Sequence, residues 1–191
     1  YTENRYNILM DRAYIPVTMG LSAGVRANLG KAKGWGTDIS ADYSKIFSNN
    51  WWLKVHANYT YAHSQYVFYE EPSYPDNEKY LLHAGQPVSQ QWGLIAERLF
   101  IDDNDVANSP RQDFGEYGAG DIKYRDMNGD GEITNLDRVP IGYPTTPEII
   151  YGMGFSTGYK AFDFSIFFQG SARSSFWIDA AKTAPFIPSQ D

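Results

Sequence analysis

Residues 120–170 read GDIKYRDMNGDGEITNLDRVPIGYPTTPEIIYGMGFSTGYKAFDFSIFFQG. An acidic, turn-rich segment leads here into two segments in which apolar and polar residues alternate. The acidic segment is typical of a cation-binding loop, because hard divalent cations prefer carboxylate, amide and carbonyl oxygens. The alternating segments predict paired β-strands. The stretch therefore predicts an all-β fold with an acidic loop beside a hairpin.

The acidic segment follows the D-x-[DN]-x-[DN]-G pattern of a calcium loop. Gly131 occupies the position of the sharp turn, Glu132 would offer its backbone carbonyl, and Thr134 would reach the ion directly or through water. We expect a structural calcium site whose candidate ligands are Asp126, Asn128, Asp130, Glu132, Thr134 and Asp137. The alternative is a turn cluster, rich in Asp, Asn and Gly, that needs no ion.

Two features set this loop apart from an EF-hand. Its last ligand position holds Asp137 where an EF-hand has glutamate, so the loop is closer to those of dockerins. Pro140 follows too soon for a full exiting helix. We therefore expect the loop without the helix–loop–helix scaffold.

The segment after the loop alternates with period two, and the turn at Lys160 and Ala161 returns the chain into a second alternating segment. One predicted face carries Ile149, Tyr151, Met153, Phe155, Thr157, Tyr159, Phe162, Phe164, Ile166 and Phe168. The opposite face carries Ile150, Gly152, Gly154, Ser156, Gly158, Asp163, Ser165, Phe167 and Gln169. Such a pattern suits a membrane barrel with lipid outside and water inside, although a soluble sheet with one buried face alternates in the same way.

Composition favours the barrel. Aromatic residues make up 16% of the 191 residues, while the mean hydropathy is -0.48. Interfacial rings combined with long polar loops are typical of outer-membrane strands. No apolar run approaches the roughly 18 residues that a membrane-spanning helix needs. The net charge of -7 and the lack of a Lys/Arg cluster argue against nucleic acid as a partner.

An earlier hairpin repeats the pattern. Residues 34–47 and 51–66 alternate on either side of a short turn, while residues 1–33 give no clear pattern. Rings gather at the turns of both hairpins, as in a membrane-interface girdle: Phe47, Trp51, Trp52, Tyr159 and Phe162. We expect strands at about 34–47, 51–66, 147–159 and 162–172, with an extracellular loop region over 67–146 that includes the strand-like piece 90–100 and the acidic loop.

Catalytic chemistry finds little support. Cysteine is absent, and His56 and His63 are seven residues apart, which places them on opposite faces of one strand. The acids at 70–71 and 102–105 could imitate the paired carboxylates of a glycosidase, but solvated loop charge explains them better. Three loop aromatics could stack on sugar rings or pack within the loop: Trp92, Tyr117 and Tyr124. We expect no enzyme.

Three segments carry a family resemblance. They are GKAKGWGTD (30–38), the Gly85-Gln-Pro run leading to Trp92-Gly, and GDIKYRDMNGDGEITNLDRVPIGYPTTPEIIYG (120–152) followed by YKAFDFSIFFQG (159–170). They resemble the SusC/RagA family of TonB-dependent outer-membrane transporters, found mostly in Bacteroidota. The resemblance covers the chain from about residue 30 onward, and the segment 120–170 is highly specific.

The resemblance implies that the chain is an internal fragment of a plugged barrel of the roughly 22-stranded class, from its later strands. By resemblance, the cargo would be an oligosaccharide or peptide, captured with a SusD-like surface lipoprotein. The TonB complex would act through a plug domain that has no counterpart here, and outer-membrane lipid would surround the wall. The alternatives are a secreted, calcium-stabilised β-sandwich that binds carbohydrate and, less favoured, a soluble glycosidase.

Overall fold

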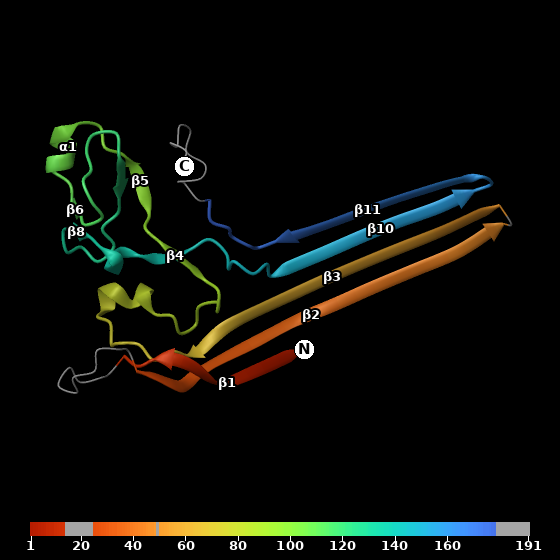
Figure 1. Ribbon diagram of the computed structural model, residues 1–191, viewed down its shortest axis with the longest axis horizontal. Helices are drawn as coiled ribbons and strands as arrows, with labels where there is room; N and C mark the ends of the chain where they lie inside the picture. Colours follow the sequence, from red (N-terminus) through yellow and green to blue (C-terminus); the bar gives the residue numbers. More distant parts are fainter. Residues whose placement is uncertain (14–24, 49, 179–191) are drawn as a thin grey trace, which may run out of the picture.

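The computed structural model describes residues 1–13, 25–48 and 50–178. Its main element is a five-stranded antiparallel sheet in the order β1-β2-β3-β10-β11. The strands are β1 (Thr2–Asp11), β2 (Arg26–Ser48), β3 (Trp51–Phe68), β10 (Ile149–Tyr159) and β11 (Phe162–Ala172). The tips of both long hairpins lie at one end of the sheet, and a small subdomain lies at the other (Figure 1).

The two hairpins join edge to edge, because β10 pairs with β3 on one side and with β11 on the other. Lys160 in the second turn has a φ of 54°, the positive value that tight hairpin turns require. Its N–H donates a hydrogen bond of 2.7 Å to the carbonyl of Asn50 in the first turn. At this end of the sheet Phe47 and Trp51 stack, with ring centroids 4.0 Å apart. The aromatic cluster at the turns is therefore present.

The register separates two chemically different faces. Tyr43 pairs with Val55, which pairs with Phe155, and Phe155 pairs with Ile166. On the other face the neighbouring row is made of Ser44, Lys54, Ser156 and Ser165. We call these the apolar face and the polar face. The alternation expected from the sequence is confirmed in all four long strands.

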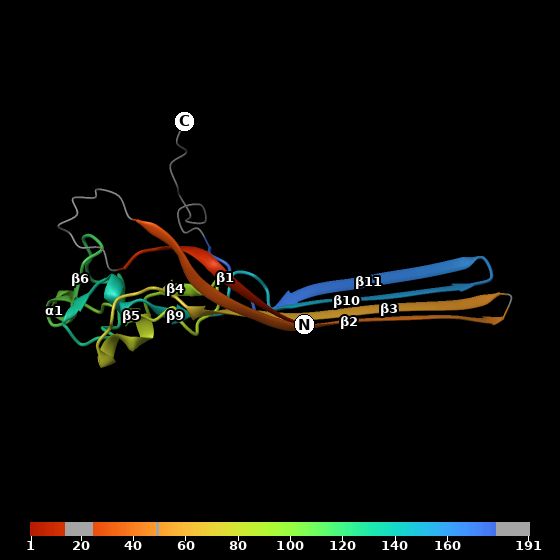
Figure 2. The same ribbon diagram turned by 90° about the horizontal axis from the view of Figure 1, so that it is seen from below.

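No layer covers the apolar face among the described residues, and the sheet is a single layer when viewed from its edge (Figure 2). Exposed fractions there reach 52% for Tyr43, 54% for Met153 and 56% for Phe168. The buried hydrophobic side chains of the described residues lie in the other half of the molecule: Met10, Ala32, Leu81, Phe100, Ile133 and Val139. A β-sandwich would place a second sheet on this face, whereas a barrel wall would face lipid there.

The N-terminal part of the sheet extends beyond the expected strands. Instead of starting at residue 34, the second strand starts at Arg26, and β1 pairs with its first half through an irregular register near Ile8. Gly30 lies at this irregularity, and a Cβ there would come within 2.3 Å of Met10 Cε. A Cβ there would also lie 2.9 Å from Ile8 Cβ, so the close packing favours glycine at this position, and the glycine masks the alternation. Residues 14–24, within the segment that gave no clear pattern, lie outside the described residues.

Residues 69–147 form the small subdomain, hereafter the outer subdomain. It contains η2 (Asp76–Leu81), β4 (Gln91–Gly93), β5 (Ala96–Leu99), α1 (Asp103–Ala107), β6 (Arg111–Gln112), β7 (Ile122–Tyr124), β8 (Glu132–Ile133), η3 (Asn135–Asp137) and β9 (Val139–Ile141). Its strands form three two-stranded sheets, β4-β9, β5-β7 and β6-β8. Phe100, which is 2% exposed, and Ile133, which is fully buried, anchor its core.

The segment 90–100 supplies β4 and β5 to the outer subdomain and does not enter the large sheet. β3 and β10 are therefore direct neighbours despite the long segment between them, which the expected loop region over 67–146 allows. Within the part of the chain that the structure describes, no helix is long and apolar enough to cross a membrane.

Candidate functional site

The acidic loop is folded around its own backbone N–H groups. Asp126 accepts hydrogen bonds from Gly129 N (2.6 Å) and Gly131 N (2.8 Å). Asp130 accepts one from Glu132 N at 2.8 Å, and Asn128 Nδ2 donates to its other oxygen. These bonds, led by the one from Glu132, lower the pKa of Asp130 below its ordinary value. Gly129 and Gly131 both have positive φ, which the tight turn requires.

Asp137 has a structural role that its place in the motif did not indicate. It is fully buried, and its carboxylate accepts hydrogen bonds from Met127 N (2.8 Å) and Thr134 N (2.7 Å). Thr134 in turn caps the short helix η3, whose third residue is Asp137. β9 follows η3 directly, so the expectation of a loop without an exiting helix is confirmed.

The six candidate ligands lie in one loop, but their side chains are engaged elsewhere. Glu132 extends to Arg111, with 3.2 Å between Oε1 and Nη2, and Thr134 accepts from Leu136 N. Within the described ranges, no three acidic or histidine side chains form a group that could hold a metal ion. Carboxylate oxygens have further lone pairs beyond those used by the backbone. Calcium binding at this loop therefore stays a prediction.

A buried charge cluster lies where the outer subdomain meets the sheet. Glu148 is 4% exposed, and its carboxylate contacts His63 Nδ1 on one side. Its other oxygen lies 2.7 Å from Arg173 Nε, and the Arg173 guanidinium lies over the ring of Tyr143. The backbone joins the same partners, since Glu148 O accepts from Ala62 N and Glu148 N donates to Arg173 O. One residue thus connects β3, the start of β10 and the segment after β11.

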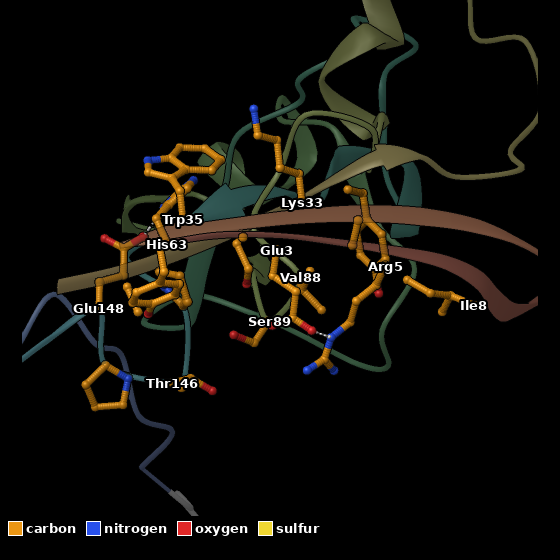
Figure 3. A pocket seen from close by; sticks show the side chains of 18 residues that line it. Glu3, Arg5, Ile8, Lys33, Trp35, His63, Val88, Ser89, Thr146 and Glu148 are labelled. Carbon is orange, nitrogen blue, oxygen red and sulfur yellow. Dashed lines mark hydrogen bonds and ion pairs between the residues drawn. The ribbon is translucent and has the colours of Figure 1, made fainter. Parts of the chain in front are cut away.

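Beside this cluster is a cavity of about 490 Å³ (Figure 3). Its lining includes Glu3 and Arg5 of β1, Val88 and Ser89 of the outer subdomain, and Glu148 on the left of the view in Figure 3. Small residues of the sheet contribute to its lining, namely Ala32, Gly34 and Ala62. Sequence reasoning missed both features, because they combine segments as far apart in the chain as Glu3 and Glu148.

The polar face of the sheet carries its own paired groups. Asp42 contacts His56 across the β2-β3 pair, and Thr60 donates to Asp38 at 3.0 Å. Ser156 and Ser165 share a hydrogen bond of 2.8 Å. The register places His56, opposite Asp42, and His63, opposite Trp35, on different faces of β3, as their spacing predicted.

Most of the loop acids are bound to cations or to backbone N–H groups. Glu70 pairs with Arg12, and Glu71 accepts from His83 N and Ala84 N. Asp105 receives both terminal nitrogens of Arg98. That contact and a hydrogen bond from Ile101 N hold the pKa of Asp105 well below its ordinary range. Such a carboxylate stays ionised near neutral pH, which disfavours a general-acid role.

The loop aromatics pack internally. Trp92 lies against His83, with ring centroids 4.7 Å apart, and His83 stacks on Tyr69. Tyr117 stacks on Phe100, and its hydroxyl accepts from Gln112 N at 3.1 Å. The β7 strand holds Tyr124 by its backbone, and its side chain is half-buried. Packing within the subdomain, the alternative to sugar stacking, thus accounts for Trp92 and Tyr117.

Comparison with curated proteins finds two receptors of Formosa agariphila. TonB-dependent receptor P26 is 46% identical over 53 residues, which is 28% of this chain and 5% of that protein. TonB-dependent receptor P3 is 23% identical over 181 residues, which is 90% of this chain and 18% of that protein. The chain thus spans less than a fifth of either relative. No family model matches the sequence.

Solved structures match the fold. The RagAB peptide importer in the 'open-open' state matches with a TM-score of 0.57 and 14% identity, over 91% of this chain and 18% of that chain. The 'closed-closed' state matches with a TM-score of 0.54 and 15% identity over the same shares. These matches and the receptor relatives confirm the resemblance stated from the sequence and the all-β, antiparallel fold of a barrel segment. The names found are those of receptors and an importer, in line with the expectation of no enzyme.

Proposed function

We propose that this chain, which is similar over most of its length to TonB-dependent receptors of the outer membrane, forms wall and outer lid of an importer. The observation that carries the proposal is the uncovered apolar face backed by a polar face. Lipid would solvate the aromatic and aliphatic side chains, while the polar face would line the lumen. The hairpin tips with their aromatic cluster would then lie at the periplasmic interface, and the outer subdomain would face the outside.

The cargo we propose is an oligosaccharide or a peptide, captured together with a SusD-like surface lipoprotein. The peptide alternative is supported by the fold match to a peptide importer, and the oligosaccharide alternative by the sequence resemblance. Energy would come from the TonB complex through a plug domain supplied by another part of the protein. This chain would contribute part of the barrel wall along which the cargo passes, and it would carry the outer subdomain as a lid.

Deleting most of the outer subdomain tests whether it is needed for cargo capture while the sheet forms the barrel wall. In the full-length receptor, replacing residues 72–142 with a short Gly/Ser linker should abolish lipoprotein capture and cargo uptake while the barrel still folds. Co-purification of the lipoprotein and uptake of labelled oligosaccharides and peptides would be measured, with an uncoupler as the control for energy coupling. Uptake that persists at the wild-type rate, or a wild-type receptor with no energy-dependent uptake, would refute the proposal.

We also propose that calcium orders the acidic loop. Sites of this type bind with a Kd on the order of 10⁻⁴ to 10⁻³ M. Millimolar calcium should slow hydrogen exchange over residues 126–137 of the wild-type receptor and leave the same segment unchanged in Asp130→Ala. Magnesium serves as the control cation, since it prefers stricter octahedral sites. Equal exchange with calcium and with a chelator would show that the loop needs no ion.

A further inference from the structure

Phe167 is an aromatic side chain on the polar face of the sheet, away from the hairpin turn where Trp52 lies on the same face. Phe167 pairs with Gly154, which pairs with His56 on its other side. It therefore shares its face with the serines and acids, and it is 59% exposed. Lipid explains the exposed rings of the apolar face but cannot explain this one. A large apolar surface exposed to water more often marks a contact site.

Two glycines allow the Phe167 ring to lie against the sheet. A Cβ at Gly154 would be 3.2 Å from Phe167 Cδ2, and a Cβ at Gly152 would be 3.3 Å from Phe167 Cζ. Both distances are shorter than ordinary contacts, so side chains there would lift the ring. The ring thus packs flat over the backbone of β10 and leaves its opposite side free.

Two amides flank the same position. Gly152 pairs with Asn58 on β3 and with Gln169 on β11, so the two amides stand on either side of a residue without a side chain. Two strand spacings separate them, about 10 Å. Asn58 leans inward, because its Oδ1 lies 2.5 Å from where a Cβ of Gly152 would be. Neither amide side chain has a hydrogen-bond partner among the described residues.

These groups border an open hollow of about 390 Å³, a volume within the usual range for small-molecule sites. Its lining residues are Asn58, Ile150, Tyr151, Gly152, Phe167, Gln169, Gly170 and Ser171. None of these side chains carries a charge. The hollow therefore offers an aromatic surface together with amide and hydroxyl groups. These groups suit an uncharged ligand that contains a ring about as wide as the Phe167 ring.

We propose that the hollow over Gly152 is a subsite for one sugar ring of a neutral oligosaccharide passing through the lumen. The ring's C–H face would pack on Phe167, and its hydroxyls would bond to the amides of Asn58 and Gln169. A charged ligand would gain nothing from this lining. The inference rests on the proposed function, since it takes the polar face to be the lumenal wall, and it narrows the cargo to the saccharide alternative.

The test uses the full-length receptor in detergent and neutral hexasaccharides of glucose, xylose, galactose and mannose as probes. Binding would be measured by calorimetry. Phe167→Ala should weaken binding of at least one probe roughly 3- to 10-fold, the effect of losing one ring contact. Phe167→Tyr should retain binding. Gly152→Val should weaken it more than 10-fold, because the new side chain would displace both the Asn58 amide and the Phe167 ring.

Ser165→Ala is the matched control, since it lies on the same face outside the hollow, and all variants must keep the heat-modifiable mobility of a folded barrel. Unchanged affinities in Phe167→Ala and Gly152→Val would overturn the proposal. So would a receptor that binds none of the four saccharides, or one whose Phe167→Ala variant loses affinity only for a blocked, uncharged hexapeptide. Energy-dependent uptake by the wild type, measured separately, shows whether such a failure concerns the subsite alone or the importer function as well.

Discussion

Replacing Ile166 with arginine should lower the free energy of unfolding in lipid by about 2–4 kcal/mol, whereas the same change at Ser165 should have little effect. The two residues are neighbours near the middle of β11, so they differ in face and hardly in depth. Ile166 pairs with Phe155 on the apolar face, and Ser165 pairs with Ser156 on the polar face. An arginine at 166 would have to enter hydrocarbon, while one at 165 would enter water.

The measurement is a urea titration of the receptor refolded into vesicles, followed by tryptophan fluorescence. Ile166→Leu is the control, because it changes the shape of the side chain at position 166 without introducing a charge. Similar destabilisation by both arginine variants would mean that both faces of the sheet are in contact with protein.

Replacing Glu148 with glutamine should loosen the junction between the outer subdomain and the sheet, at a cost of about 2–3 kcal/mol. Removing one partner from a buried ion pair leaves uncompensated charge and costs up to about 5 kcal/mol, less here because Arg173 is 45% exposed. His63 and Arg173 would both lose their anion. The effect should be local, because the strand pairs of the sheet do not depend on this side chain.

Hydrogen exchange over residues 142–148 and 173–175 would measure this effect, with faster exchange in Glu148→Gln than in the wild type. Glu97→Gln is the control, because Glu97 pairs with Arg125 at an exposed site where an ion pair contributes at most about 1 kcal/mol. Equal exchange in both variants would mean that backbone hydrogen bonds alone hold the junction.

Strand alternation made the two long hairpins predictable from the sequence. Period-two patterns are local, and the turns at 48–50 and 160–161 mark their ends. β1 and the first half of β2 were missed because Gly30 interrupts the pattern where Met10 packs close. A local pattern cannot show that a glycine serves a neighbouring strand.

The candidate sites were predictable only in part. The loop with Asp126 and Asp137 was visible as a motif, but the burial of Asp137 depends on packing of the outer subdomain. Phe167 stood out in the sequence as the one ring on the polar side of its segment. The role we propose for Phe167 depends on the register that places Gly152 between Asn58 and Gln169, which no local pattern shows. The sequence around Glu148 likewise gave no local signal for the charge cluster.

The most direct test of the barrel-wall account is a scan of lipid and water exposure along β11. Single cysteines would be introduced at positions 163–169 of the full-length receptor in lipid vesicles and labelled with nitroxides. Accessibility to oxygen and to a water-soluble nickel complex would be read by electron paramagnetic resonance. The account predicts oxygen maxima at 164, 166 and 168 and nickel maxima at 163, 165, 167 and 169. Accessibility without this period of two, or with both faces shielded, would contradict it.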